Sequence, residues 1–163
     1  MLFFLTPIFV STLFAADPDA VKLRDGLRRG EYDAVIKSAG ESIEKRVFGE
    51  EWYLIKAEAE NAIGRYQASV ETLQAGLQRY SWSVRLRQAG LMSARLAGQP
   101  ELATIWVREI EAQATQAPWR YTDPESLVAI GRSAIASGID ARAVLEKIYD
   151  RAKQQNPKLR DVW

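Results

Sequence analysis

The sequence predicts an all-α protein in which short helices pair into hairpins and the hairpins stack on one another. Three observations predict this fold. Glycines recur at even spacing, at Gly30, Gly64 and Gly98. Apolar residues on both sides of these glycines recur at helical spacing. The stretches "RRGEYDAVIKSA", "AIGRYQASVETL" and "LAGQPELATIWV" also share small or apolar residues at equivalent positions. A fixed period of this kind is typical of a repeat protein.

The composition restricts the function. The chain has 163 residues, 47% of them apolar, and a formal net charge of +1 from 22 basic and 21 acidic residues. Nucleic acids and anionic membrane surfaces favour concentrated positive charge, so the overall charge predicts neither as a partner. The sequence contains no Cys and no His, which excludes disulfides, thiolate sites, a Ser-His-Asp triad and any zinc site that uses His. We therefore expect no cofactor and no metal.

The N-terminal segment predicts export. The stretch from Leu2 to Ala16 is uncharged and almost wholly apolar, and Asp17 follows it. It is too short to span a bilayer as a helix, which needs roughly 20 residues. It ends in two alanines, which suit a signal-peptidase site. We interpret residues 1–16 as a signal peptide, which would place the mature chain in the periplasm, the cell envelope or the extracellular space. A buried N-terminal helix is the alternative.

The second repeat unit shows both helices of a hairpin. Before the turn, Trp52, Ile55, Ala59 and Ala62 form one apolar stripe. A second stripe follows the turn, at Tyr66, Val70, Leu73, Leu77 and Tyr80. Glycine suits the turn because a helix commonly ends with a residue at positive φ, which glycine adopts at little cost. Neither helix buries its stripe alone, so the pairs must stack.

The fourth unit is less regular. It is the stretch "ESLVAIGRSAIASGIDARAVLEKIYDRA", whose Gly138 lies farther from Gly98 than one repeat period. The extra residues fall in "QATQAPWRYTDPE", where prolines and polar residues predict a loop. The final helix is expected over 141–153. In the third unit, Pro100 suits the first turn of the second helix.

This pattern resembles the tetratricopeptide repeat (TPR), whose period of about 34 residues equals the spacing of the turn glycines. The spacing of the first-helix motif is kept best in the fourth unit, at Leu127, Ile130, Gly131, Ala134 and Gly138. The second unit departs from the family, because Lys56 stands where glycine is usual. The resemblance covers residues 17–157. It implies a right-handed α-solenoid of about four TPR-like helix-turn-helix repeats after the signal peptide.

The C-terminal residues resemble the beginning of another repeat. In the family, a late proline is followed six residues later by the large apolar residue that opens the next first helix. Pro157 and Trp163 have this spacing. We interpret residues 158–163 as the start of a further, missing repeat. A natural end with a frayed tail is the alternative.

The resemblance also implies a concave binding face lined mainly by first helices. On this chain that face includes Glu51, Leu54 and Glu58. The expected partner-binding residues are Asn61, Arg85, Gln88, Met92, Arg95 and Arg132. The arginines favour a protein or peptide partner with acidic character. One family mode grips a terminal carboxylate with Lys and Asn, and the corresponding positions here are Leu54 and Glu58, so that mode is not expected.

Other chemistry-bearing residues are interpreted structurally. The paired carboxylates have no accompanying nucleophile or positioned base, so we expect no catalytic residue. Bulky aromatic residues lie in the connections between repeats, at Tyr80, Trp82, Trp119 and Tyr121. For these, packing between repeats is favoured over exposed contact with a partner.

Three functional hypotheses follow. The first is a non-catalytic exported TPR scaffold that binds a protein or peptide on its concave face. The second is the N-terminal accessory TPR region of a larger secreted hydrolase or peptidase, whose catalytic domain lies beyond residue 163. The third is a module that self-associates end to end through its C-terminal helix, with Trp163 as a subunit contact.

Overall fold

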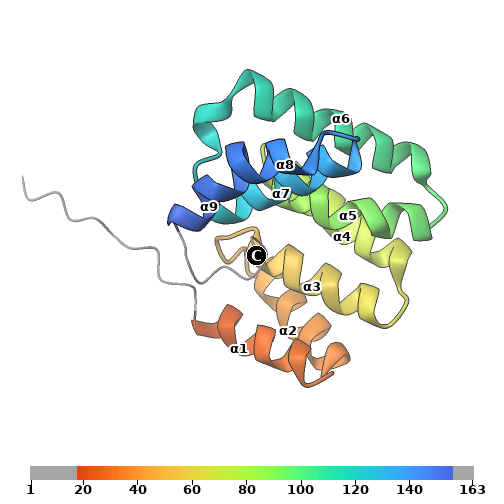
Figure 1. Cartoon of the computed structure of the whole chain (residues 1–163). Coiled ribbons are helices and arrows are strands. Elements are labelled where there is room, and N and C mark those ends of the chain that lie inside the picture. Colours follow the sequence, from red (N-terminus) through yellow and green to blue (C-terminus); the bar gives the residue numbers. More distant parts are fainter. Residues whose placement is uncertain (1–17, 156–163) are drawn as a thin grey trace, which may run out of the picture.

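The computed structural model describes residues 18–155, and within them every regular element is helical (Figure 1). The first six helices are α1 (Pro18–Arg28), α2 (Tyr32–Glu44), α3 (Glu51–Ala62), α4 (Tyr66–Arg79), α5 (Val84–Leu96) and α6 (Pro100–Gln116). A 3₁₀ turn, η1 (Pro118–Arg120), then leads to α7 (Pro124–Ala136). The last elements are α8 (Ala141–Val144), the π-helical turn η2 (Leu145–Tyr149) and α9 (Asp150–Gln155). The all-α prediction is confirmed.

The helices pack as stacked hairpins. Each helix contacts the next one along the chain, and the first helices α1, α3, α5 and α7 also contact one another in that order. Figure 1 shows the turns that follow α1, α3 and α5 on the right of the stack, and the α2–α3 and α6–α7 connections on the left. This arrangement is compatible with a helical repeat protein.

The glycine turns share one geometry. They are formed by Gly30, Gly64, Gly98 and Gly138, whose φ angles are 78°, 77°, 76° and 87°. In the second turn, the Gly64 N–H donates to the Asn61 carbonyl at 3.0 Å and the Arg65 N–H donates to the Glu60 carbonyl at 2.8 Å. The other three turns repeat both bonds, which is the Schellman ending of a helix. A Cβ atom added at Gly64 would meet nothing within 4 Å. The positive φ angle therefore requires glycine here, whereas the space around it would admit a side chain. The predicted turns are confirmed.

Most residues of the predicted apolar stripes are buried or half-buried, but Ala62 at the end of the first stripe is exposed. Trp52, Ile55 and Ala59 of α3 are 2%, 0% and 0% exposed. On α4, Val70 and Leu73 are fully buried. The stripe of α3 packs on α1 and α2, whereas Tyr53 and Ala57 on another face of α3 pack on α4 and α5, so no hairpin forms a core of its own.

Two glycines inside first helices allow a large aromatic ring to reach the helix backbone. A Cβ at Gly90 of α5 would overlap the ring of Trp106 of α6, and a Cβ at Gly131 of α7 would overlap the ring of Tyr149 of η2. Trp106 is 3% exposed. These two hairpins are therefore held together by an aromatic ring against a helix that has no side chain at the contact.

The second hairpin replaces this contact with buried polar groups. Lys56 and Thr72 lie one repeat period before Gly90 and Trp106. The Lys56 ammonium pairs with the Glu60 carboxylate and donates to the Thr72 hydroxyl at 2.7 Å, while that hydroxyl donates to Glu60 at 2.8 Å. Glu60 is 3% exposed, so its charge is balanced inside the protein by Lys56.

The aromatic residues of the connections fall into two groups. Tyr121 is 5% exposed, and its O–H donates to the Trp82 carbonyl at 3.0 Å. Burial raises the pKa of the Tyr121 phenol, against the opposing effect of Arg87 and Arg120. The packing interpretation is confirmed for Tyr121, but it is wrong for Trp82 and Trp119, which are 49% and 72% exposed.

Two further differences from the sequence predictions concern the chain ends. The helix expected over 141–153 is interrupted by η2, at the position where Tyr149 packs on Gly131. The predicted signal peptide (1–16) and the predicted start of another repeat (158–163) lie outside the described residues. Within 18–155, none of the helices is both long enough and apolar enough to cross a bilayer.

Candidate functional site

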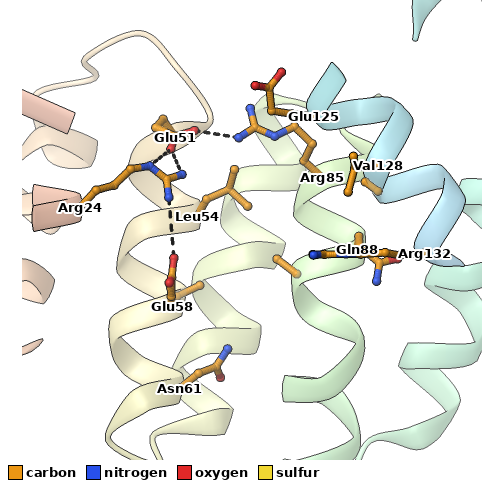
Figure 2. A pocket seen from close by; sticks show the side chains of 13 residues that line it. Arg24, Glu51, Leu54, Glu58, Asn61, Arg85, Gln88, Glu125, Val128 and Arg132 are labelled. Carbon is orange, nitrogen blue, oxygen red and sulfur yellow. Dashed lines mark hydrogen bonds and ion pairs between the residues drawn. The ribbon is translucent and has the colours of Figure 1, made fainter. Parts of the chain in front are cut away.

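The first helices of the hairpins line a groove of about 660 Å³ (Figure 2). Its side chains come from all four first helices, α1, α3, α5 and α7. They are Arg24, Glu51, Leu54, Ala57, Glu58, Asn61, Arg85, Gln88, Ala89, Glu125, Val128, Ala129 and Arg132. The groove is therefore a product of the stacking and belongs to no single hairpin.

The repeat register explains which residues face the groove. In α3, the lining residues Glu51, Leu54 and Glu58 follow one another at the i, i+3, i+7 spacing of one helix face. Positions at the same distances before the turn glycine are Glu125, Val128 and Arg132 in α7, and Arg85, Gln88 and Met92 in α5. Equivalent faces of stacked helices form one continuous surface.

Ion pairs cross the groove floor from one first helix to the next. Arg24 of α1 donates from Nε to Glu51 of α3 at 2.7 Å, and its Nη1 lies 4.0 Å from Glu58. Arg85 of α5 pairs with Glu51 at 3.0 Å and with Glu50 at 3.1 Å. Figure 2 shows Glu51 between the two arginines. Such partly exposed pairs are each worth about 0.2–1 kcal/mol, so their main effect is to fix the positions of the side chains.

The groove has no excess of either charge. Among the described residues that line it, three are arginines and three are glutamates. Leu54, Val128 and three alanines supply apolar surface between them. The side chains therefore do not support the acidic partner preferred from the sequence, and a segment of mixed charge fits them better.

Two amides face this surface. The Asn61 side-chain oxygen accepts from the Ser93 hydroxyl at 3.0 Å, which itself accepts from the Ser69 hydroxyl at 3.2 Å. The Gln88 side-chain oxygen is buried and has no donor among the residues that the structure describes. A buried acceptor without a donor is unfavourable, so an N–H group from a ligand would satisfy Gln88 after its amide turns.

The expected partner-binding residues are only partly brought together. Asn61, Arg85, Gln88 and Arg132 line the groove. Met92 and Arg95 do not; both lie closer to the glycine turn of α5, and Met92 is 60% exposed. Sequence reasoning missed Ala57, Ala89 and Ala129, and it also missed three lining residues with larger side chains, Arg24, Glu125 and Val128. The number of residues between each of these three and its turn glycine, Gly30 or Gly138, was the feature of the sequence that could have identified them.

Within the described ranges, no three acidic side chains are grouped so that they could hold a metal ion. In comparisons with known proteins, the chain matches no protein-family model and no curated protein.

Proposed function

We propose that the mature chain is a non-catalytic, exported scaffold of the TPR type that holds a protein or peptide segment in the groove. In this proposal the chain is a right-handed solenoid of about four repeats. The observation that carries it is the groove itself. Side chains at the same sequence distance from the turn glycines line one groove, with a volume of about 660 Å³, across α1, α3, α5 and α7.

The lining chemistry favours a peptide segment. A volume of this size is comparable with small-molecule sites, but here it is open along a row of helices and lined by mixed charge. Leu54 and Val128 offer apolar contacts to such a segment. Arg132 and Glu125 at one end favour opposite charges in the same segment.

A matched pair of variants tests the groove. Ala89 lines it and is exposed, whereas Ala75 is exposed on the second helix α4. Peptides are selected from a displayed random library on the wild-type protein, and their affinity is then measured for Ala89→Phe and Ala75→Phe by fluorescence anisotropy. A ring in the groove should weaken binding by about tenfold or more, which is about 1.4 kcal/mol. Ala75→Phe should bind as the wild type does.

Two outcomes would contradict the proposal. One is a set of selected peptides that bind Ala89→Phe as tightly as the wild type. The other is a loss of affinity of equal size in both variants. Circular dichroism of each variant checks that the fold is kept, so that a loss of binding reports on the groove.

Export is a separate part of the proposal. It rests on the apolar residues 1–16 and the two alanines at their end. Secretion from a bacterial host followed by intact-mass measurement should give a chain that begins at or next to Asp17. A chain that keeps residues 1–16 would refute it.

A further inference from the structure

The connections between successive hairpins lie next to one another: Figure 1 shows the α2–α3 and α6–α7 connections on the side away from the glycine turns, and hydrogen bonds join the α4–α5 connection to both. They are residues 45–50, 80–83 and 117–123. Each connection carries one exposed aromatic side chain: Phe48, Trp82 and Trp119 are 78%, 49% and 72% exposed. Phe48 and Trp82 are separated by one repeat period. We call these three rings the aromatic edge.

Two tyrosines hold this edge in place. The Tyr80 ring packs edge-to-face against Phe48, with 6.2 Å between the centroids, and its oxygen accepts from the Gly49 N–H at 2.8 Å. Tyr121 ties the next connection to the one before it through the Trp82 carbonyl. Because these bonds fix the connections before any partner arrives, little ordering is needed when the rings bind.

Basic side chains accompany the rings. The Arg120 guanidinium lies 4.5 Å from the centroid of the Trp82 ring, and Arg79 lies 5.6 Å from that of Tyr80. Lys45 and Arg46 precede Phe48 in the first connection.

The acidic side chains of these connections are already engaged. Glu50 pairs with Arg85, and Asp123 accepts the Ser126 N–H as the cap of α7. Lys45, Arg46 and Arg120 outnumber Glu50 and Asp123, so the three connections carry a formal net charge of +1, and Arg79 adjoins them.

The arrangement favours a lipid surface over a folded protein partner. Hot spots of protein interfaces gather near one centre and are ringed by other contacts. Here the rings are divided among separate connections, one in each, with cations beside them. Tryptophan at the headgroup level, together with Lys and Arg facing anionic lipids, is the composition of membrane-surface contacts.

We propose that the aromatic edge docks the chain onto an anionic lipid surface, with the three rings in the headgroup region and the basic residues facing lipid phosphates. This contact is peripheral and uses residues other than those that line the groove. A peptide could therefore be held in the groove while the edge is bound.

The absence of Cys from the sequence allows a site-specific test. An environment-sensitive fluorophore is attached to the full chain at Ser81→Cys, within the edge, or at Thr104→Cys, an exposed site near the start of α6. Vesicles of phosphatidylcholine with phosphatidylglycerol are then added. The emission should shift to the blue at position 81 and stay unchanged at position 104.

Substitutions give the second arm, measured as vesicle co-sedimentation of the fluorophore-free chain. The double variant Trp82→Ser/Trp119→Ser should partition roughly tenfold more weakly, because two large apolar surfaces no longer leave water. Ile105→Ser removes an apolar side chain that is 49% exposed on α6, and should change partition less than about twofold. The groove variant Ala89→Phe should partition as the wild type does, which keeps this test separate from that of the groove.

Three results would overturn the proposal. An equal blue shift at both labels would mean adsorption through another part of the chain, such as residues 1–16. No shift at either label would mean that the edge serves a soluble partner. Unchanged partition of the double tryptophan variant would mean that the rings do not enter the lipid.

Discussion

Gly90 offers a quantitative test of how the hairpins are held together. In α5 it faces Trp106 of α6, and a Cβ added there would overlap one ring atom and lie 2.9 Å from two others. Ordinary carbon–carbon contacts are about 3.5–4.0 Å. Trp106 is enclosed by buried neighbours that include Val70, Leu91 and Ala103, so the ring has little room to move away. Gly90→Ala should therefore overpack the core.

The expected penalty can be worked out from two opposing effects. Overpacking a well-filled core costs about 1–3 kcal/mol, and the enclosed ring puts this site near the upper value. The better helix propensity of alanine offsets about 1 kcal/mol of this loss in the free energy of unfolding. The net loss in the free energy of unfolding should be about 2 kcal/mol, which lowers the Tm by about 4–8 °C for a chain of this size.

Urea unfolding followed by far-ultraviolet circular dichroism measures this loss. The control is the same substitution in a Trp106→Leu background, where the ring is absent and Gly90→Ala should be neutral or stabilising. The coupling between the two substitutions should then be about 2 kcal/mol. An equal penalty in both backgrounds would refute the account, because it would mean that the ring does not cause the loss.

Three further predictions concern other positions. Gly98→Ala should lower the free energy of unfolding by about 1 kcal/mol, because Gly98 has a φ of 76° although an added Cβ would meet nothing within 4 Å. Gly98→Asn should lower it less, and equal losses in thermal unfolding would count against the turn geometry. Lys56→Met should lower the free energy of unfolding, measured in urea, by about 2 kcal/mol, because it leaves the buried Glu60 carboxylate without its cation. A loss below about 0.5 kcal/mol would show that this ion pair contributes little to stability. The pKa of Tyr121 is raised in the folded state, so the folded protein keeps a proton that the unfolded chain loses above about pH 10. The contribution of Tyr121 to stability is therefore present below about pH 10 and is lost as the pH rises through the folded pKa. Tyr121→Phe should therefore show a shallower alkaline loss of stability than the wild type, and identical alkaline slopes would contradict this.

The helices and their turns could be predicted because their signals are local. Positive φ at Gly30, Gly64 and Gly98 is required by a helix ending that involves only a few consecutive residues. The apolar stripe containing Trp52 is likewise visible at helical spacing in the sequence, and burial is confirmed for Trp52, Ile55 and Ala59 but not for Ala62.

The groove and the connections were harder to predict because they depend on contacts between repeats. Arg24 reaches the groove only because α1 stacks on α3, where Glu51 holds it. In the connections, Tyr121 and Trp119 are two residues apart in the same stretch, yet one is buried and the other is exposed. Nothing in residue type separates them; the hydrogen bond of Tyr121 to the Trp82 carbonyl does.

The central claim, that the groove holds a peptide segment, is tested most directly by thiol footprinting of a selected peptide. Single cysteines at Ala89 in the groove and at Ala75 on α4 are introduced into a chain that has none. The rate of modification by a thiol reagent is measured at each site with and without the peptide. The account predicts strong slowing at Ala89→Cys and no change at Ala75→Cys. Unchanged modification at Ala89→Cys with saturating peptide would contradict it.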